Sequence, residues 1–154
     1  MADYFFDTSG LVKRHVTEVG SRWVRSLTQA GAAHSLYIVR ITAVEMVAAI
    51  TRRQRGGSLS AAQAGAILGH FRRHVGSRYF VLEVSPTLLS AAMDLSRKHG
   101  LRAYDAVQLA AAMVLDRNNK ADGYGPVTMI SADHELNAAA MTEGLIVDDP
   151  SLHP

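Results

Sequence analysis

The chain has 154 residues, of which 48% are hydrophobic and 19% are charged. This size and composition suit one domain with its own apolar core, and they exclude an intrinsically disordered chain, which is poor in apolar residues and rich in charge. The absence of cysteine excludes a disulfide scaffold, an iron–sulfur cluster, cysteine-ligated zinc and a cysteine nucleophile. Sixteen Lys and Arg against fourteen Asp and Glu leave a net charge of +2, which is only a weak indication of a polyanionic partner.

Short apolar runs predict strands, and longer periodic stretches that end at glycine predict helices. In chain order, the expected elements are a strand at 4–6, a short helix at 12–16, a helix at 17–29, a strand at 36–39, a helix at 42–55, a helix that Ser58 or Ser60 caps and that ends near 75, a strand at 79–84, helices at 86–99 and 104–118, a strand at 127–130, a helix at 133–143 and a strand at 145–147. Thr17 is the expected N-cap of the second helix, and residues 119–126 are predicted to form a surface loop.

Because strands alternate with helices, the predicted fold is α/β, with a mainly parallel central sheet between helices in three layers. No signal peptide is recognisable, and the longest uncharged apolar run in a helix, residues 106–115, is too short to span a bilayer. We therefore expect one cytoplasmic domain over residues 1–150, followed by a short tail at 151–154. Regular structure is expected to end at 148–150, with Asp148 and Asp149 solvated.

Three acidic residues follow strands or begin helices. Asp7 follows the first strand directly, Asp133 lies just after the strand at 127–130, and Asp105 begins a helix whose next ten residues are uncharged. Each has an ordinary alternative explanation, since an acidic residue at a helix N-terminus is favoured by capping and by the helix dipole. In a parallel sheet, however, ligands bind beyond the carboxyl ends of the strands, where Asp7 and Asp133 are expected.

Glu45 is the only ionisable residue between Arg40 and Arg52, and its helical neighbours at i−4, i−1, i+3 and i+4 are all apolar. A carboxylate in such surroundings loses hydration unless something compensates. The alternative to a functional role is a buried ion pair with Arg52 or another basic group.

Four carboxylates that meet in one cleft would repel one another and have raised pKa values unless cations intervene. Without cysteine or a histidine pair, an all-oxygen cluster is typical of a site for Mg²⁺ or Mn²⁺.

At these residues the sequence resembles the PIN-domain family, and within it the VapC-like toxins of type II toxin–antitoxin pairs. The similar stretches occur in the order expected for the family, at 6–13 (FDTSGLVK), 41–46 (ITAVEM), 101–110 (LRAYDAVQLA) and 130–133 (ISAD). The resemblance implies a PIN-like fold and a Mg²⁺- or Mn²⁺-dependent ribonuclease whose activity inhibits translation or growth. It also implies a small antitoxin that blocks the active site, and a toxin homodimer.

The resemblance places catalytic and metal-binding carboxylates at Asp7, Glu45, Asp105 and Asp133, and supporting hydroxyls at Thr8, Ser9 and Ser131. We expect Asp7 and Asp105 to bind the cation directly, while Glu45 and Asp133 complete the shell or hold its waters. The hydroxyl groups would orient the carboxylates. Hydrolysis of an RNA phosphodiester by one or two cations is the predicted reaction.

Two basic clusters are candidate contacts for RNA phosphates, one at Arg52, Arg53 and Arg55 and the other at Arg72 and Arg73. Their alternative explanation is that cations at helix C-termini favour the dipole and stay solvated.

Two other functions are left open by the sequence. The first is a PIN-fold module that binds a partner without catalysis. The second is a phosphotransfer domain in which Asp7 is phosphorylated, which requires a second acid close to Asp7, where only Asp3 is near in sequence, and a later Lys after a strand, although no Lys follows Lys120.

Overall fold

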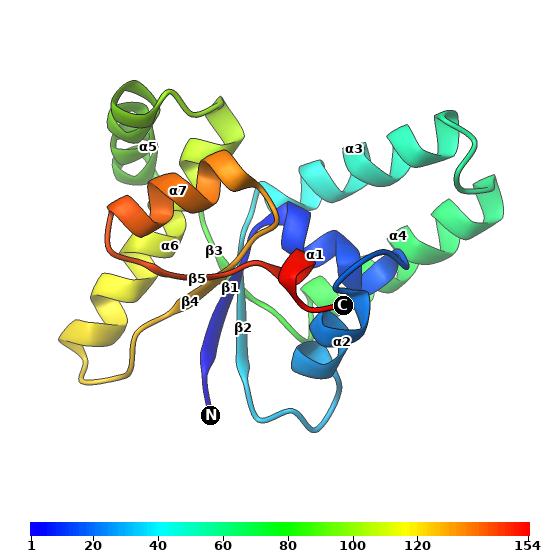
Figure 1. The fold of residues 1–154 in the computed structure, drawn as a ribbon, viewed down its shortest axis with the longest axis horizontal. Helices are drawn as coiled ribbons and strands as arrows, with labels where there is room; N and C mark the ends of the chain where they lie inside the picture. The colour runs from blue at the N-terminus through cyan, green and yellow to red at the C-terminus, as the bar shows by residue number, and fades with distance from the viewer.

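The computed structural model describes residues 1–154 and contains a five-stranded parallel sheet in the order β3-β2-β1-β4-β5 (Figure 1). The strands are β1 (Asp3–Phe6), β2 (Ser35–Val39), β3 (Phe80–Leu82), β4 (Thr128–Ile130) and β5 (Ile146–Asp148). The central strand β1 pairs with β2 on one side and with β4 on the other, and Phe6 lies opposite Ile130. This register brings the residues that follow β1 beside those that follow β4.

Seven α-helices and one 3₁₀ helix connect or follow these strands. They are α1 (Thr8–His15), α2 (Ser21–Thr28), α3 (Thr42–Arg55), α4 (Ala61–Val75), α5 (Pro86–His99), α6 (Ala103–Ala121), α7 (His134–Thr142) and η1 (Pro150–Leu152). Helices α5, α6 and α7 cover one face of the sheet and α1 to α4 lie on the other, where α3 and α4 form a projecting hairpin (Figure 1). No helix is both long and apolar enough to cross a membrane.

Because successive side chains of a strand point to opposite faces, the sheet has a separate apolar core on each face. Phe5 packs with α5, α6 and α7, whereas its neighbour Phe6 packs with α1 to α4, and both are fully buried. Leu36 and Ile38 of β2 point to the second core, while Val39 points to the first. Because side chains alternate between the faces of a strand, a sheet covered on both sides needs apolar residues at nearly every position. The expected three-layer α/β arrangement is confirmed.

Three predicted boundaries differ most from the structure. Helix α1 begins at Thr8, directly after Asp7, rather than at Val12. Helix α2 begins at Ser21 instead of following Thr17, because the Ser21 hydroxyl donates to the Val16 carbonyl and accepts from the Glu18 amide, which fixes a turn before the helix. Helix α6 continues to Ala121, into the predicted loop.

Asp149 and His153 pack against the rest of the protein, contrary to the expectation of a solvated end. Asp149 is only 9% exposed and caps η1 by accepting a hydrogen bond from the Ser151 amide at 2.8 Å. The ring of His153 stacks on Trp23 of α2 at 3.9 Å and contacts the Asp148 carboxylate. The chain after β5 therefore closes over α2.

Candidate functional site

The four acidic residues singled out in the sequence line one pocket of about 400 Å³ beyond the carboxyl ends of β1 and β4. Asp7 comes from the end of β1, Glu45 from α3, Asp105 from α6 and Asp133 from the start of α7. These residues are up to 126 positions apart in sequence, and the parallel sheet brings them to one edge, as expected for this class of fold.

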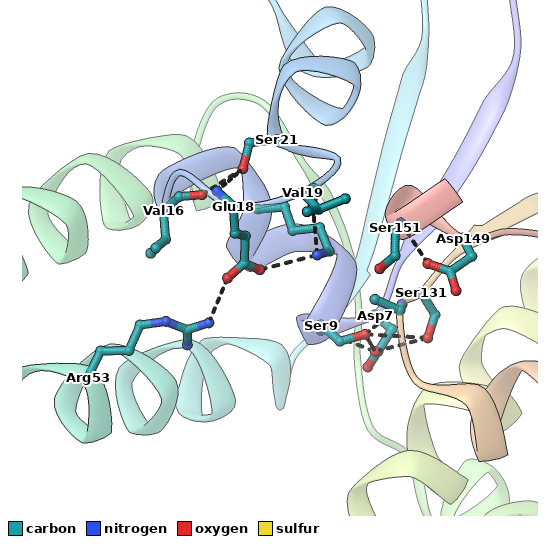
Figure 2. Close-up of polar contacts among 12 residues, drawn as sticks. Asp7, Ser9, Val16, Glu18, Val19, Ser21, Arg53, Ser131, Asp149 and Ser151 are labelled. Carbon is teal, nitrogen blue, oxygen red and sulfur yellow. Dashed lines mark hydrogen bonds and ion pairs between the residues drawn. The ribbon is translucent and has the colours of Figure 1, made fainter. Parts of the chain in front are cut away.

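Asp7 is 3% exposed and is held by hydroxyl groups from both sides of the β1–β4 pair. Its Oδ2 accepts hydrogen bonds from the Ser9 amide at 3.1 Å, the Ser9 hydroxyl at 2.5 Å and the Ser131 hydroxyl at 3.3 Å (Figure 2). The Asp7 amide donates to the Ile130 carbonyl at 3.1 Å. All these side-chain bonds end on Oδ2, so they orient the carboxylate while Oδ1 takes no part in them.

Glu45 is held by a polar cluster in an otherwise apolar region between α1, α3 and α6. Its Oε2 accepts hydrogen bonds from the Thr8 hydroxyl at 2.8 Å and from Nε2 of Gln108 at 2.6 Å. The same Gln108 amide lies 3.0 Å from the Thr42 hydroxyl. Glu45 forms no ion pair with Arg52, so the buried pair that the sequence left open as an alternative is not present.

Asp133 and Asp105 both lie at helix N-termini but in different ways. Asp133 is the N-cap of α7, and its Oδ1 accepts from the Leu136 amide at 2.9 Å. Asp105 lies in the first turn of α6, where Arg102 is the N-cap residue, and its carboxylate caps nothing. Capping therefore accounts for the local position of Asp133, as it does for Asp7 at α1, but not for that of Asp105.

Burial, and then the charges of neighbouring carboxylates, raise the pKa values of Asp7, Asp105 and Glu45. Burial, together with the charge of Glu45, raises the pKa of Asp7 to about 6 despite the hydrogen bonds from Ser9. Burial and then the charges of Asp133 and Asp7 raise the pKa of Asp105 to about 6. Burial also raises the pKa of Glu45, and the charge of Asp105 adds to this rise. The pocket thus concentrates negative charge that its own hydrogen bonds do not neutralise.

The donor chemistry of the pocket suits a hard divalent cation, because four carboxylates with several flanking hydroxyls supply only oxygen ligands. The fit rests on this chemistry and on the excess of negative charge. No three His, Asp or Glu side chains are arranged as a ready-made metal site.

Four further residues of the site were missed in the sequence: Lys13, Glu18, Tyr104 and Gln108. Gln108 is the one polar side chain in the run 106–115 and lies one turn after Asp105, a pattern that points to a buried hydrogen-bonding role. Lys13 lies one turn after Ser9 and so on the same face of α1. No sequence signal points to Glu18, which reaches the pocket from the turn before α2.

The structure separates the candidate basic residues. Arg52 and Arg53 line the pocket from the C-terminal half of α3. Arg55, Arg72 and Arg73 are exposed and lie outside it. Of the five basic candidates, only Arg52 and Arg53 therefore line the same pocket as the carboxylates.

Comparison with known proteins identifies the family. Residues 4–140 match the family model described as PIN domain. No curated protein sequence matches the chain closely enough to count as a relative.

Solved structures with the same fold include PAE2754 from Pyrobaculum aerophilum, at 25% identity and a TM-score of 0.60, covering 95% of this chain and 89% of that one. The sarcin–ricin loop cleaving toxin VapC20 of Mycobacterium tuberculosis matches at 15% identity and a TM-score of 0.63, covering 98% of this chain and 99% of that one. A toxin–antitoxin complex from Klebsiella pneumoniae matches at 16% identity and a TM-score of 0.61, covering 96% of this chain and 97% of that one. At such identities the last two show a shared fold.

Proposed function

The chain belongs to the PIN-domain family, and from this membership we propose that it is a Mg²⁺- or Mn²⁺-dependent endoribonuclease, the toxin of a toxin–antitoxin pair, which inhibits translation or growth. The observation that carries the proposal is the convergence of four carboxylates on one pocket, where burial and mutual repulsion raise two of their pKa values to about 6. Such a pocket favours a divalent cation, and a cation at a carboxylate cluster favours a phosphate ester as substrate.

Each residue has a defined task in this proposal. Asp7 and Asp105 would hold the cation, with Glu45 and Asp133 completing its surroundings. Ser9 and Ser131 fix the Asp7 carboxylate through Oδ2. When bound, the cation would polarise the phosphodiester and lower the pKa of an attacking water.

The direct test is cleavage of RNA by the purified protein with Mg²⁺ or Mn²⁺ and after addition of excess chelator. We expect cleavage only with the cation, and we expect Asp7→Asn to remove it because the substitution takes away the charge at the centre of the pocket. The matched control is Asp94→Asn on the outer face of α5, where Asp94 is exposed and lies outside this pocket. Full metal-dependent cleavage by Asp7→Asn would show that the site is wrongly assigned.

Gln108→Met is expected to lower kcat about tenfold without unfolding the protein. Methionine has a similar volume but cannot donate to Glu45, which then keeps only the hydrogen bond from Thr8. Steady-state kinetics with a short fluorescent RNA and a thermal melt would measure the two effects. An unchanged kcat would show that the orientation of Glu45 by Gln108 is irrelevant to catalysis.

An antitoxin partner and a homodimer are part of the same proposal. Exposed apolar side chains on α3 and α5, among them Val44 at 60%, Leu89 at 45% and Met93 at 67%, support burial against another chain. We expect light scattering to give the mass of a dimer and Met93→Glu to shift it to the monomer. A wild-type monomer at micromolar concentration would contradict the dimer.

The two other functions considered from the sequence have separate readouts. A binding module without catalysis would show no acid-dependent uptake of Mn²⁺ in calorimetry. A phosphotransfer domain is disfavoured, because it needs a Lys after a later strand and no Lys follows Lys120, which precedes β4 and β5. A phosphoryl-aspartate trap experiment would detect it.

A further inference from the structure

The part of the pocket that lies between α1 and α3, called the groove below, has an acidic and a basic end. On α3, Glu45 lies at the acidic end, Ala48 and Ala49 follow one turn later, and Arg52 and Arg53 come after a second turn, all lining the pocket. At 1.5 Å per residue, Glu45 and Arg53 are separated by about 12 Å along the helix axis. The small side chains between them leave room for an extended ligand that reaches from the carboxylates to the cations.

Lys13 of α1 contributes a buried cation to the same end of the groove. The whole residue is only 7% exposed and lines the pocket. Burial of an ammonium group without a compensating anion is unfavourable, so a lysine in this position needs an anionic partner.

Glu18, from the turn between α1 and α2, is the anionic partner of both Lys13 and Arg53. Its Oε1 lies 3.3 Å from Nζ of Lys13 and its Oε2 lies 3.2 Å from an Nη atom of Arg53 (Figure 2). Each carboxylate oxygen therefore faces one cation. The two non-bridging oxygens of a phosphodiester present the same arrangement of two negative oxygens on one centre, and both Lys and Arg bind phosphate.

The Glu18 carboxylate is not needed to shape its own turn. The turn is held by the Ser21 hydroxyl, which contacts the Val16 carbonyl and the Glu18 amide, and by Nζ of Lys13, which donates to the Val19 carbonyl at 2.9 Å. Since these bonds use backbone atoms of the turn, the carboxylate can leave the cations without unfolding it.

We propose that Lys13 and Arg53 form a subsite for an RNA backbone phosphate neighbouring the one that is cleaved, and that Glu18 occupies this subsite as an internal anion that the RNA displaces. The inference rests on the ribonuclease function proposed above. It assigns the RNA path to the groove between α1 and α3 and away from Arg55, Arg72 and Arg73. It also makes Glu18 a residue that weakens substrate binding in the wild-type protein.

The test compares charge changes of equal size inside and outside the groove. Glu18→Gln keeps an oxygen for Lys13 and Arg53 but removes the charge, and its control is Glu83→Gln, because Glu83 is an exposed carboxylate paired with Arg40 outside the groove. Arg53→Gln removes one cation of the subsite, and its control is Arg55→Gln, two residues further along α3 and outside the groove. The Kd for a fluorescent single-stranded RNA octamer is measured by anisotropy in EDTA over a series of salt concentrations, and kcat/KM is measured with Mg²⁺.

We expect Glu18→Gln to bind the octamer roughly three- to tenfold more tightly than Glu83→Gln, and Arg53→Gln to bind it more weakly than Arg55→Gln by a similar factor. We also expect Arg53→Gln to reduce the slope of log K against log salt by about 0.7, the value for one phosphate contact to a single strand. The changes in kcat/KM should arise in KM, with kcat preserved.

Equal affinities within each matched pair would overturn the subsite, and they would leave the ribonuclease function standing if the wild-type protein cleaves RNA with Mg²⁺. If the wild-type protein does not cleave, the proposed function fails, and the binding comparison in EDTA still decides the subsite. A thermal melt is recorded for each variant, and if Glu18→Gln does not fold, the comparison of Arg53→Gln with Arg55→Gln decides the proposal.

Discussion

Replacing Asp105 with Asn is expected to remove RNA cleavage and, without divalent cations, to make the protein more stable at pH 7.5. Cleavage should fall by about 100-fold or more, because a carboxylate that holds the cation becomes a neutral amide. Stability should rise because the pKa of Asp105 is raised to about 6 by burial and by the charges of Asp133 and Asp7, so that its ionised form is unfavourable in the folded protein.

The pH dependence of this gain follows from the direction of the shift. With a raised pKa, the folded protein binds the Asp105 proton more tightly than the unfolded chain does. The free energy of unfolding that this group contributes therefore falls as the pH rises from about 4 to about 6, and the full penalty is present above pH 6. Because the carboxylate is partly exposed to solvent, we expect a gain of about 1 kcal/mol at pH 7.5, or about 2–4 °C in Tm.

Thermal melts at pH 4 and pH 7.5, with and without Mg²⁺, measure this prediction. The difference between Asp105→Asn and the wild type should vanish at pH 4, and Mg²⁺ should stabilise the wild type more than the variant. Lower stability of the variant at pH 7.5 in EDTA would contradict the electrostatic description of the pocket. Retained cleavage would contradict the site itself.

Gly10→Ala is expected to destabilise the protein by about 3 kcal/mol, which corresponds to a fall in Tm of about 6–12 °C. Gly10 lies in α1 where this helix packs directly on the end of β4, and a Cβ atom there would lie 2.5 Å from the Ile130 carbonyl oxygen and 3.0 Å from its carbon. Both contacts are with backbone, so α1 must shift as a whole. Since Asp7 caps α1 and contacts Ser131, cleavage should also decrease.

The same substitution at Gly65 serves as the control with the opposite sign. Gly65 lies within α4, is exposed, and a Cβ atom there would meet no atom within 4 Å. Alanine should therefore stabilise the helix by about 0.5–1 kcal/mol, because glycine loses more conformational freedom on folding. Urea unfolding of both variants measures the change in the free energy of unfolding for each. A Gly10→Ala protein as stable as the wild type would show that α1 does not approach β4 as closely as described.

Local sequence pattern was sufficient to predict most of the elements and two helices to the residue, Thr42–Arg55 and Pro86–His99. Both helices carry an apolar periodicity and end at glycine, so their limits depend on neighbouring residues alone. The start of α2 was predicted wrongly because the turn before it depends on the particular contacts of Ser21 with Val16 and Glu18, which a preference for Thr as N-cap does not reveal.

The four acidic residues that line the pocket were also singled out from the sequence, by local pattern and by the family resemblance. Asp7 and Asp133 stood out as acids that follow strands, and Glu45 stood out as a charge among apolar residues. Asp105 stood out as the acid that begins an otherwise uncharged helical run. Lys13 was missed because it looks ordinary in its own helix, and Gln108 was missed although it is the one polar side chain in the run 106–115. Their role arises from packing, since Gln108 meets Glu45 across 63 residues and Lys13 meets its anion from the following turn.

By itself, the sequence determined the order and type of the elements, the burial of both faces of the sheet and the four acidic candidates for the site. Each of these could be read from residues close to one another in the chain. Only the tertiary structure decided that Arg53, and not Arg55 or the basic residues of α4, joins Lys13 and Glu18 at the end of the acidic pocket. The physical reason is that the packing of α1 on α3 sets which face of each helix lines the groove. A difference of two residues along α3 turns a side chain to the other side of the helix.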